Sequence, residues 1–248
     1  MLAIIGGSGL YRLPGFESTQ RQIVRTPFGD PSCPLTFGLI GGHPVVFIAR
    51  HGYGHSLAPH EINYRANIWA LAEQGVSGIV AVGSVGGISS SVPTGTVAVP
   101  DQIIDYTWGR AHTYFEGADI PVVHTDLTLP YDARLRARLL QAAKHAGVDA
   151  HDGGVYACTQ GPRLETAAEI RRLERDGADM VGMTGMPEAA LAREKGVPYA
   201  CLAPVVNWAA GKGDSVASVT FDSQSQGFAT ALESVGKILI AAVTHGSH

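Results

Sequence analysis

Short apolar runs alternate along the chain with amphipathic stretches, and this alternation predicts an α/β fold. Most of the runs are apolar at every position, which is typical of strands covered on both faces. We expect strands at Leu2–Ile5, Val45–Ala49, Gly78–Val82, Thr96–Pro100, Val155–Thr159, Met180–Gly182 and Tyr199–Val206.

The amphipathic stretches predict helices over residues 60–75, 132–147, 164–176, 187–195 and 223–243. The last of these places Phe228, Leu232, Val235 and Leu239 on one face at steps of three and four. Each of the first four is followed closely by a glycine, which favours a left-handed helix cap. The glycines are Gly75, Gly147, Gly177 and Gly196.

Composition narrows the functional classes. The 248 residues are 45% hydrophobic and 16% charged, with a net charge of −4, so no electrostatic reason points to nucleic acid or a membrane as partner. The N-terminus lacks the basic lead-in and cleavage site of a signal peptide. No apolar stretch approaches the ~20 residues of a transmembrane helix. The three widely spaced cysteines are expected to be buried thiols, and the compartment is expected to be the reducing cytoplasm.

A candidate anion site begins where the strand Val45–Ala49 ends. Arg50 and His51 follow that strand directly, and open α/β sheets bind their ligands at strand ends. The planar fork of arginine can bind two oxygens of a phosphate, although a surface arginine and a loop histidine would give the same local pattern. Glycine-bearing turns with a hydroxyl follow three other strands and strengthen the anion hypothesis, since exposed N–H groups can cradle a phosphate. Their hydroxyls belong to Ser8, Ser84 and Thr184.

Other ligand motifs do not fit. The first turn reads GGSGL and lacks the third glycine of a dinucleotide fingerprint, and no Walker loop occurs. His51, His55 and His60 do not share a helical face, and there is no HExxH or CxxC pair, so no metal site is expected.

Taken together, the motifs GGSGL, RHG…PHEINYRAN, VGSVGGI, TQGPRLET and GMTGMPE, followed by the strand ending at Asn207, resemble the trimeric purine nucleoside phosphorylases. The resemblance runs from about Ile4 to Asp222 and is strongest to the branch that contains methylthioadenosine phosphorylase. It implies a single domain over residues 1–248, with a mixed central β-sheet flanked by helices. It also implies cleavage of a purine nucleoside by phosphate without a metal or organic cofactor, in a homotrimer or a dimer of trimers.

The resemblance also assigns roles to residues. Phosphate would be held by Ser8, Arg50, His51, Ser84 and Thr184 with the backbone near Gly83, and Met183 would lie against the ribose. Asn207, followed by Trp208 and Ala209, would contact the purine, so that Asn207 and His51 are the candidate catalytic residues. In a long segment, His124 and the pair Tyr114-Phe115 could reach a neighbouring subunit's sugar site or simply cover their own core.

Three positions predict the substrate within the family, two at the base and one at the 5′ end of the ribose. Glu165 stands where 6-oxopurine enzymes carry a glutamate that accepts from the purine N1–H, and Asn207 offers an NH₂ donor to O6 or N7. Phe221, or Val219 if the alignment shifts, makes the 5′ wall apolar, which favours a methylthio group over a hydroxyl. We therefore expect phosphorolysis of 5′-methylthioinosine. The alternatives are an inosine/guanosine phosphorylase and, in another class, a non-catalytic nucleoside or phosphate sensor.

Overall fold

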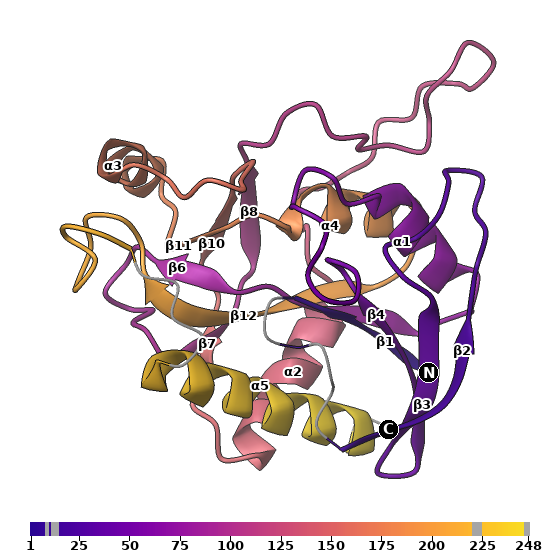
Figure 1. Ribbon diagram of the computed structural model, residues 1–248, viewed down its shortest axis with the longest axis horizontal. Helices are drawn as coiled ribbons and strands as arrows, with labels where there is room; N and C mark the ends of the chain where they lie inside the picture. The colour runs from indigo at the N-terminus through magenta and orange to yellow at the C-terminus, as the bar shows by residue number, and fades with distance from the viewer. Residues whose placement is uncertain (8–9, 11–14, 220–224, 246–248) are drawn as a thin grey trace.

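The computed structural model describes residues 1–7, 10, 15–219 and 225–245, and within them a long mixed sheet runs through the molecule (Figure 1). The strand order is β2-β3-β4-β1-β5-β12-β6-β11-β10-β8, and the short strands β7 and β9 pair beside β12. The strands are β1 (Leu2–Gly6), β2 (Phe16–Gln22), β3 (Leu35–Ile40), β4 (His43–Ala49), β5 (Gly78–Val82), β6 (Val85–Gly87), β7 (Val97–Val99), β8 (Gln102–Asp105), β9 (His151–Asp152), β10 (Val155–Cys158), β11 (Met180–Gly182) and β12 (Tyr199–Trp208).

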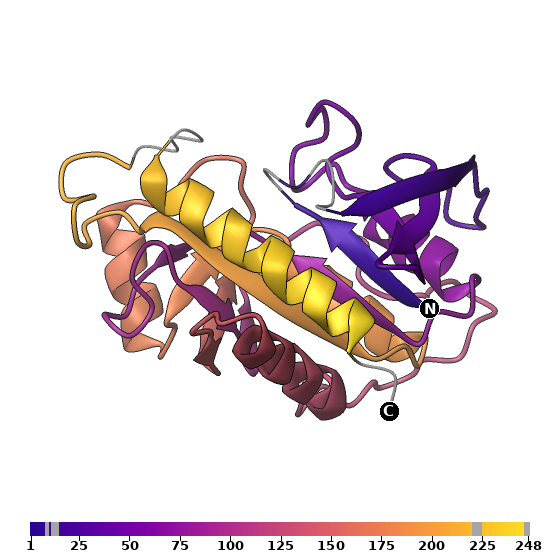
Figure 2. The same ribbon diagram turned by 90° about the horizontal axis from the view of Figure 1, so that it is seen from below.

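Helices cover both faces of this sheet. Helices α2 and α5 lie side by side on one face, as Figure 2 shows, and α1 and α4 pack together on the other. The helices are α1 (Tyr64–Ala72), α2 (Ala133–His145), α3 (Ala167–Arg175), α4 (Gly185–Glu194) and α5 (Gln226–Thr244). Side-chain caps at Asn63, Asp132, Thr166 and Ser225 accept from the first-turn amides of α1, α2, α3 and α5, which explains where those helices begin.

The sheet has two halves that run in opposite directions. Strands β4, β1, β5 and β12 are mutually parallel, whereas β11 is antiparallel to β6, which is itself parallel to β12. Strand β12 carries the sheet from one half to the other, because its first part pairs with β5 and its last part with β6, with a register shift between Val205 and Asn207, and the direction reverses at the next pair, β6 and β11. Because β6 begins just after β5 ends and pairs antiparallel with β11, the carboxyl ends of β5 and β11 meet at the start of β6, in the middle of the sheet.

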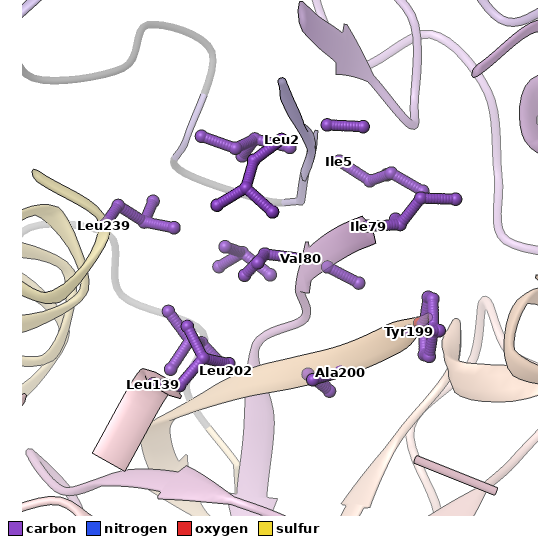
Figure 3. Close-up of a cluster of buried hydrophobic side chains, with 14 of the residues drawn as sticks. Leu2, Ile5, Ile79, Val80, Leu139, Tyr199, Ala200, Leu202 and Leu239 are labelled. Carbon is purple, nitrogen blue, oxygen red and sulfur yellow. The ribbon is translucent and has the colours of Figure 1, made fainter. Parts of the chain in front are cut away.

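The core lies where the first half of the sheet meets α2 and α5 (Figure 3). Leu2, Val80 and Leu202 come from β1, β5 and β12, and they are 5% exposed or less. Leu139 of α2 and Leu239 of α5 complete the cluster from the helical side. The packing of this half positions the ends of β1, β4 and β5, which carry part of the site.

The strands and helices expected from the sequence are all present, with ends that differ by a few residues, and the glycines after the first four helices adopt positive φ angles. The three cysteines are buried and free. We expected no apolar stretch as long as a transmembrane helix. This was wrong, because α5 is 19 residues long and apolar enough to span a membrane by composition. Half of its apolar window is buried in the protein and it packs on α2 and β12, as a core helix does.

Candidate active site

A cavity of about 400 Å³ opens where the two halves of the sheet meet, a volume that suits a small ligand. Its lining comes from the ends of β1, β4, β5, β10, β11 and β12 and the segments that follow them. Among the expected site residues it includes Arg50, His51, Gly83, Ser84, Glu165, Met183, Thr184, Asn207, Ala209 and Val219. Most of the site residues expected from the sequence are therefore brought together.

Arg50 is buried, with 1% of its surface exposed, and its fork is already engaged within the protein. Its Nε and Nη2 donate to the two carboxylate oxygens of Glu188, both at 2.7 Å, and its Nη1 donates to the Val82 carbonyl at 2.8 Å. Burial alone would lower the pKa of Arg50, but the charge and hydrogen bonds of Glu188 raise it above its usual value. Arginine has five N–H donors, so Nη1 and Nη2 each keep one beyond these bonds. Arg50 is thus a fixed cation beside the cavity.

His51 is a neutral imidazole. Its Nδ1 lies 2.9 Å from the Leu57 carbonyl oxygen, which can only accept, so Nδ1 carries the proton and Nε2 keeps a lone pair. Burial, the charge of Arg50 and the neighbouring His55 lower the pKa of His51 to about 4, although the Leu57 hydrogen bond opposes the shift. His51 therefore presents an acceptor at neutral pH rather than a second cation.

Gly83 and Thr184 are close neighbours in the lining of the cavity. The Gly83 amide donates to the Leu202 carbonyl at 3.1 Å, so this glycine contributes space rather than a backbone donor. A Cβ placed on Gly83 would lie 3.3 Å from Oγ1 of Thr184. Thr184 precedes α4 but its hydroxyl makes no helix-capping bond.

Asn207 stands at the irregularity of β12, where the strand changes partners. Such a bulge redirects a side chain and is common next to active sites. Its Nδ2 donates to the carbonyl of Trp208 at 2.7 Å, which fixes the amide plane. The ring of Trp208 lies against Gly213, and Trp208 is not part of the cavity lining.

Glu165 lies between two cavities. It lines the main cavity and also a neighbouring one of about 310 Å³, whose other lining residues include Thr159 and Gln160. Its Oε1 accepts a hydrogen bond of 2.6 Å from Oγ1 of Thr159. One carboxylate oxygen is thus held by the protein, and Glu165 precedes the capping box of α3 that begins at Thr166.

Two buried residues near the site were missed by the sequence analysis. Glu188, fully buried, holds Arg50 and also accepts from the Tyr199 hydroxyl at 2.8 Å. Arg110, 8% exposed, donates to the carbonyls of Met183, Met186 and Gln160 and so ties the segment after β10 to the segment after β11. The only sequence signal for Glu188 was its place in the GMTGMPE motif.

The structure does not place every expected site residue in the cavity. Ser8 and Phe221 lie outside the described residues, so their assigned roles stay predictions. Tyr114 packs on Phe28 and Trp69 of its own chain, and His124 is exposed and outside the cavity lining. In the described part of the chain no group of three histidine, cysteine or acidic residues could hold a metal ion.

A buried cation, a carboxylate and an amide around one cavity, at the meeting ends of a mixed sheet, define an α/β enzyme for a polar small molecule. The chain belongs to the phosphorylase superfamily, whose family model matches residues 1–244.

Named relatives and solved structures agree with this family. A protein of Xanthomonas campestris named probable S-methyl-5′-thioinosine phosphorylase is 56% identical over 86% of each chain. The 6-oxopurine nucleoside phosphorylase of Pyrococcus furiosus is 44% identical over 98% of this chain and 91% of its own. The methylthioadenosine phosphorylase of Schistosoma mansoni, solved with adenine, superposes with a TM-score of 0.93 at 32% identity, covering 100% of this chain and 92% of that one. The mixed sheet flanked by helices is therefore the nucleoside phosphorylase fold, as the resemblance implied.

Proposed function

We propose that this protein cleaves 5′-methylthioinosine with inorganic phosphate and releases hypoxanthine and 5-methylthioribose 1-phosphate. The observation that carries the proposal is that Glu165 and Asn207 line the same cavity as Arg50 and His51. Glu165 and Asn207 suit a 6-oxopurine, and Arg50 and His51 suit phosphate. The chemistry needs no metal or organic cofactor.

At the phosphate end, the fixed cation and the neutral histidine have complementary roles. Arg50, held by Glu188, directs its remaining N–H groups to phosphate oxygens, together with the hydroxyls of Ser84 and Thr184 and, by the resemblance, Ser8. His51 accepts a hydrogen bond from the OH group of monohydrogen phosphate through Nε2, which leaves the unprotonated oxygens of the phosphate to act as the nucleophile. Groups oriented before the reaction stabilise developing charge without reorganising.

At the purine end, the leaving base takes up negative charge as the glycosidic bond breaks. Asn207 donates its remaining N–H to N7 or O6 of this base, and Glu165 accepts from N1–H. Adenine has no proton on N1, so its lone pair would face the carboxylate, and such a mismatch can reject a substrate by several powers of ten.

At the ribose end, the soft side chain of Met183 packs on the sugar and Val219 gives the 5′ region an apolar wall. An apolar wall suits a methylthio group, because a buried hydroxyl without a partner is costly. Three relatives that are 51–56% identical are named probable S-methyl-5′-thioinosine phosphorylases, which supports the same substrate.

The second candidate is a 6-oxopurine nucleoside phosphorylase that accepts inosine or guanosine, favoured by the Pyrococcus furiosus relative that matches almost the whole chain. Initial rates on methylthioinosine, inosine, guanosine and methylthioadenosine, with and without phosphate, separate the two. We expect phosphate-dependent turnover with methylthioinosine preferred. Equal rates on inosine would overturn the 5′ argument, fast methylthioadenosine cleavage would overturn the base argument, and binding without turnover would make the protein a sensor.

The base assignment has its own test in the double variant Asn207→Asp/Glu165→Ser. An aspartate can accept from the 6-amino group and donate to N7, and serine removes the carboxylate that opposes a bare N1. We expect the rate on methylthioadenosine relative to methylthioinosine to rise at least tenfold, about the value of one hydrogen bond to a charged group. An unchanged ratio in a folded double variant would show that neither residue reads the base.

We also propose a cytoplasmic homotrimer or dimer of trimers. The segment between β8 and α2 projects from the body (Figure 1), and it exposes Trp108 and Val122 at 72% and 78%. Exposed apolar groups on a projecting segment suit contact with another subunit. Light scattering after size-exclusion chromatography gives the mass and distinguishes a trimer from a hexamer or a monomer.

A further inference from the structure

Thr159 directly follows β10, and the surrounding backbone fixes its position. Its amide donates to the Gly182 carbonyl of the neighbouring strand end at 2.8 Å. Its own carbonyl accepts from Nη2 of Arg110 at 3.3 Å, and the next carbonyl, of Gln160, accepts from the same nitrogen at 2.8 Å. The side chain of Thr159 therefore starts from a backbone that is held on both sides.

The Thr159 hydroxyl has two acceptors within reach but only one proton. Oε1 of Glu165 lies at 2.6 Å and the Gly182 carbonyl at 3.3 Å. The carboxylate is closer and charged, and the carbonyl already accepts from the Thr159 amide, so the proton belongs to Glu165.

This bond reaches Glu165 from outside the main cavity. Thr159 lines the neighbouring cavity and not the main one, whereas Glu165 lines both. Thr159 thus binds Oε1 from the side of the neighbouring cavity, and the other lone pairs of the carboxylate stay available to a ligand in the main cavity. A glutamate has three rotatable bonds, and one oxygen anchored in this way limits where the other can lie.

We propose that Thr159 is a positioning residue that sets the purine specificity of the enzyme through Glu165. Its hydroxyl holds the carboxylate in the orientation that accepts the N1–H of a 6-oxopurine, and it touches neither the base nor the phosphate. This inference rests on the proposed function, because it takes Glu165 as the residue that reads the base.

The test uses Thr159→Val and Thr159→Ser, each alone and in a Glu165→Ala background, in the full-length protein. Valine keeps the branched shape and fills the space, whereas alanine would admit water from the neighbouring cavity in place of the hydroxyl. For each variant, kcat and KM are measured with methylthioinosine and methylthioadenosine at saturating phosphate, and KM is measured for phosphate.

We expect Thr159→Val to lower kcat/KM for methylthioinosine by about 10- to 100-fold, the range for losing a hydrogen bond to a charged group. The values for methylthioadenosine and the KM for phosphate should stay within about threefold. Thr159→Ser keeps the hydroxyl and should restore most of the preference. In the Glu165→Ala background, Thr159→Val should have no further effect on either substrate.

Four outcomes would overturn the inference. An equal loss on both nucleosides, or a raised KM for phosphate, would make Thr159 a general structural residue. A further effect of Thr159→Val in the Glu165→Ala background would show that it does not act through the glutamate. If Glu165→Ala lowers the 6-oxo preference but Thr159→Val does not, the inference alone fails. If Glu165→Ala leaves that preference unchanged, the base assignment itself is wrong and the inference fails with it.

Discussion

Removing the charge of Glu188 should destabilise the protein strongly, because Arg50 would remain buried as an unpaired cation. Both side chains are almost completely buried, at 1% and 0% exposure, and two of the three hydrogen bonds from Arg50 go to Glu188. In Glu188→Gln the new NH₂ group must face a donor of Arg50 in either orientation of the amide, because Arg50 donates to both carboxylate oxygens and Tyr199 shares one of them. Breaking a buried pair by removing one partner costs about 3–5 kcal/mol.

For a chain of this size, 1 kcal/mol shifts the melting temperature by about 2–4 °C, so Glu188→Gln should lower it by roughly 6–20 °C. Thermal and urea unfolding measure the loss. Glu233→Gln, which removes one partner of the exposed Lys237 pair, is the matched control and should leave the melting temperature within measurement error.

The double variant Arg50→Met/Glu188→Gln separates stability from function. It removes the buried cation while the glutamine oxygen can still accept from Tyr199, so we expect it to be more stable than Glu188→Gln alone. Its KM for phosphate should nevertheless rise by about 10- to 100-fold, since Arg50 is proposed to bind that ion. A loss below about 2 °C in Glu188→Gln, or a double variant no more stable than the single one, would refute the reasoning.

Two further predictions concern the phosphate end of the cavity. The folded protein keeps His51 neutral down to its pKa of about 4, whereas in the unfolded chain the histidine binds a proton near pH 6.5. The free energy of unfolding should therefore fall by up to about 3 kcal/mol as the pH drops from 6.5 to 4, and His51→Asn should remove most of this dependence in urea titrations at both pH values. An equal fall in the free energy of unfolding in the unsubstituted protein and in His51→Asn would contradict this prediction. Gly83→Ala places a methyl group 3.3 Å from Oγ1 of Thr184 without meeting backbone, so it should raise the KM for phosphate about tenfold with little change in melting temperature. A large thermal loss with an unchanged KM would show that Gly83 serves packing.

The sequence predicted the elements whose pattern is local. Strands such as β5 are fully apolar runs, and helix ends were marked by caps and glycines, so their positions followed from the chain itself. Strands β2, β3, β6, β8 and β9 were missed. Of these, β2 is a polar edge strand, exposed along almost its whole length and paired with β3. Its strand character comes from a partner, which no local pattern reveals.

The site also combines features that the local sequence predicts with features that depend on contacts made in the folded chain. Arg50 and His51 could be placed at a strand end, but the carboxylate that holds Arg50 lies 138 residues away in the chain. The protonated nitrogen of His51 depends on the Leu57 carbonyl, and the anchoring of Glu165 depends on Thr159. The sequence predicted many of the side chains that form the site. Which of their donors and acceptors remain for a ligand depends on hydrogen bonds to residues that come together in the folded protein.

The reversal of direction between the two halves of the sheet also bears on how such enzymes diversify. Arg50, His51 and Ser84 follow strands of one half, Glu165 follows a strand of the other, and Asn207 lies on the strand that joins them. Substitutions beside Glu165 can thus change which purine is accepted without moving Arg50, His51 or Ser84, and Thr184 is the phosphate residue that shares a half of the sheet with Glu165. A lineage can keep one reaction and exchange its substrates, which accords with the different nucleosides in the names of its relatives.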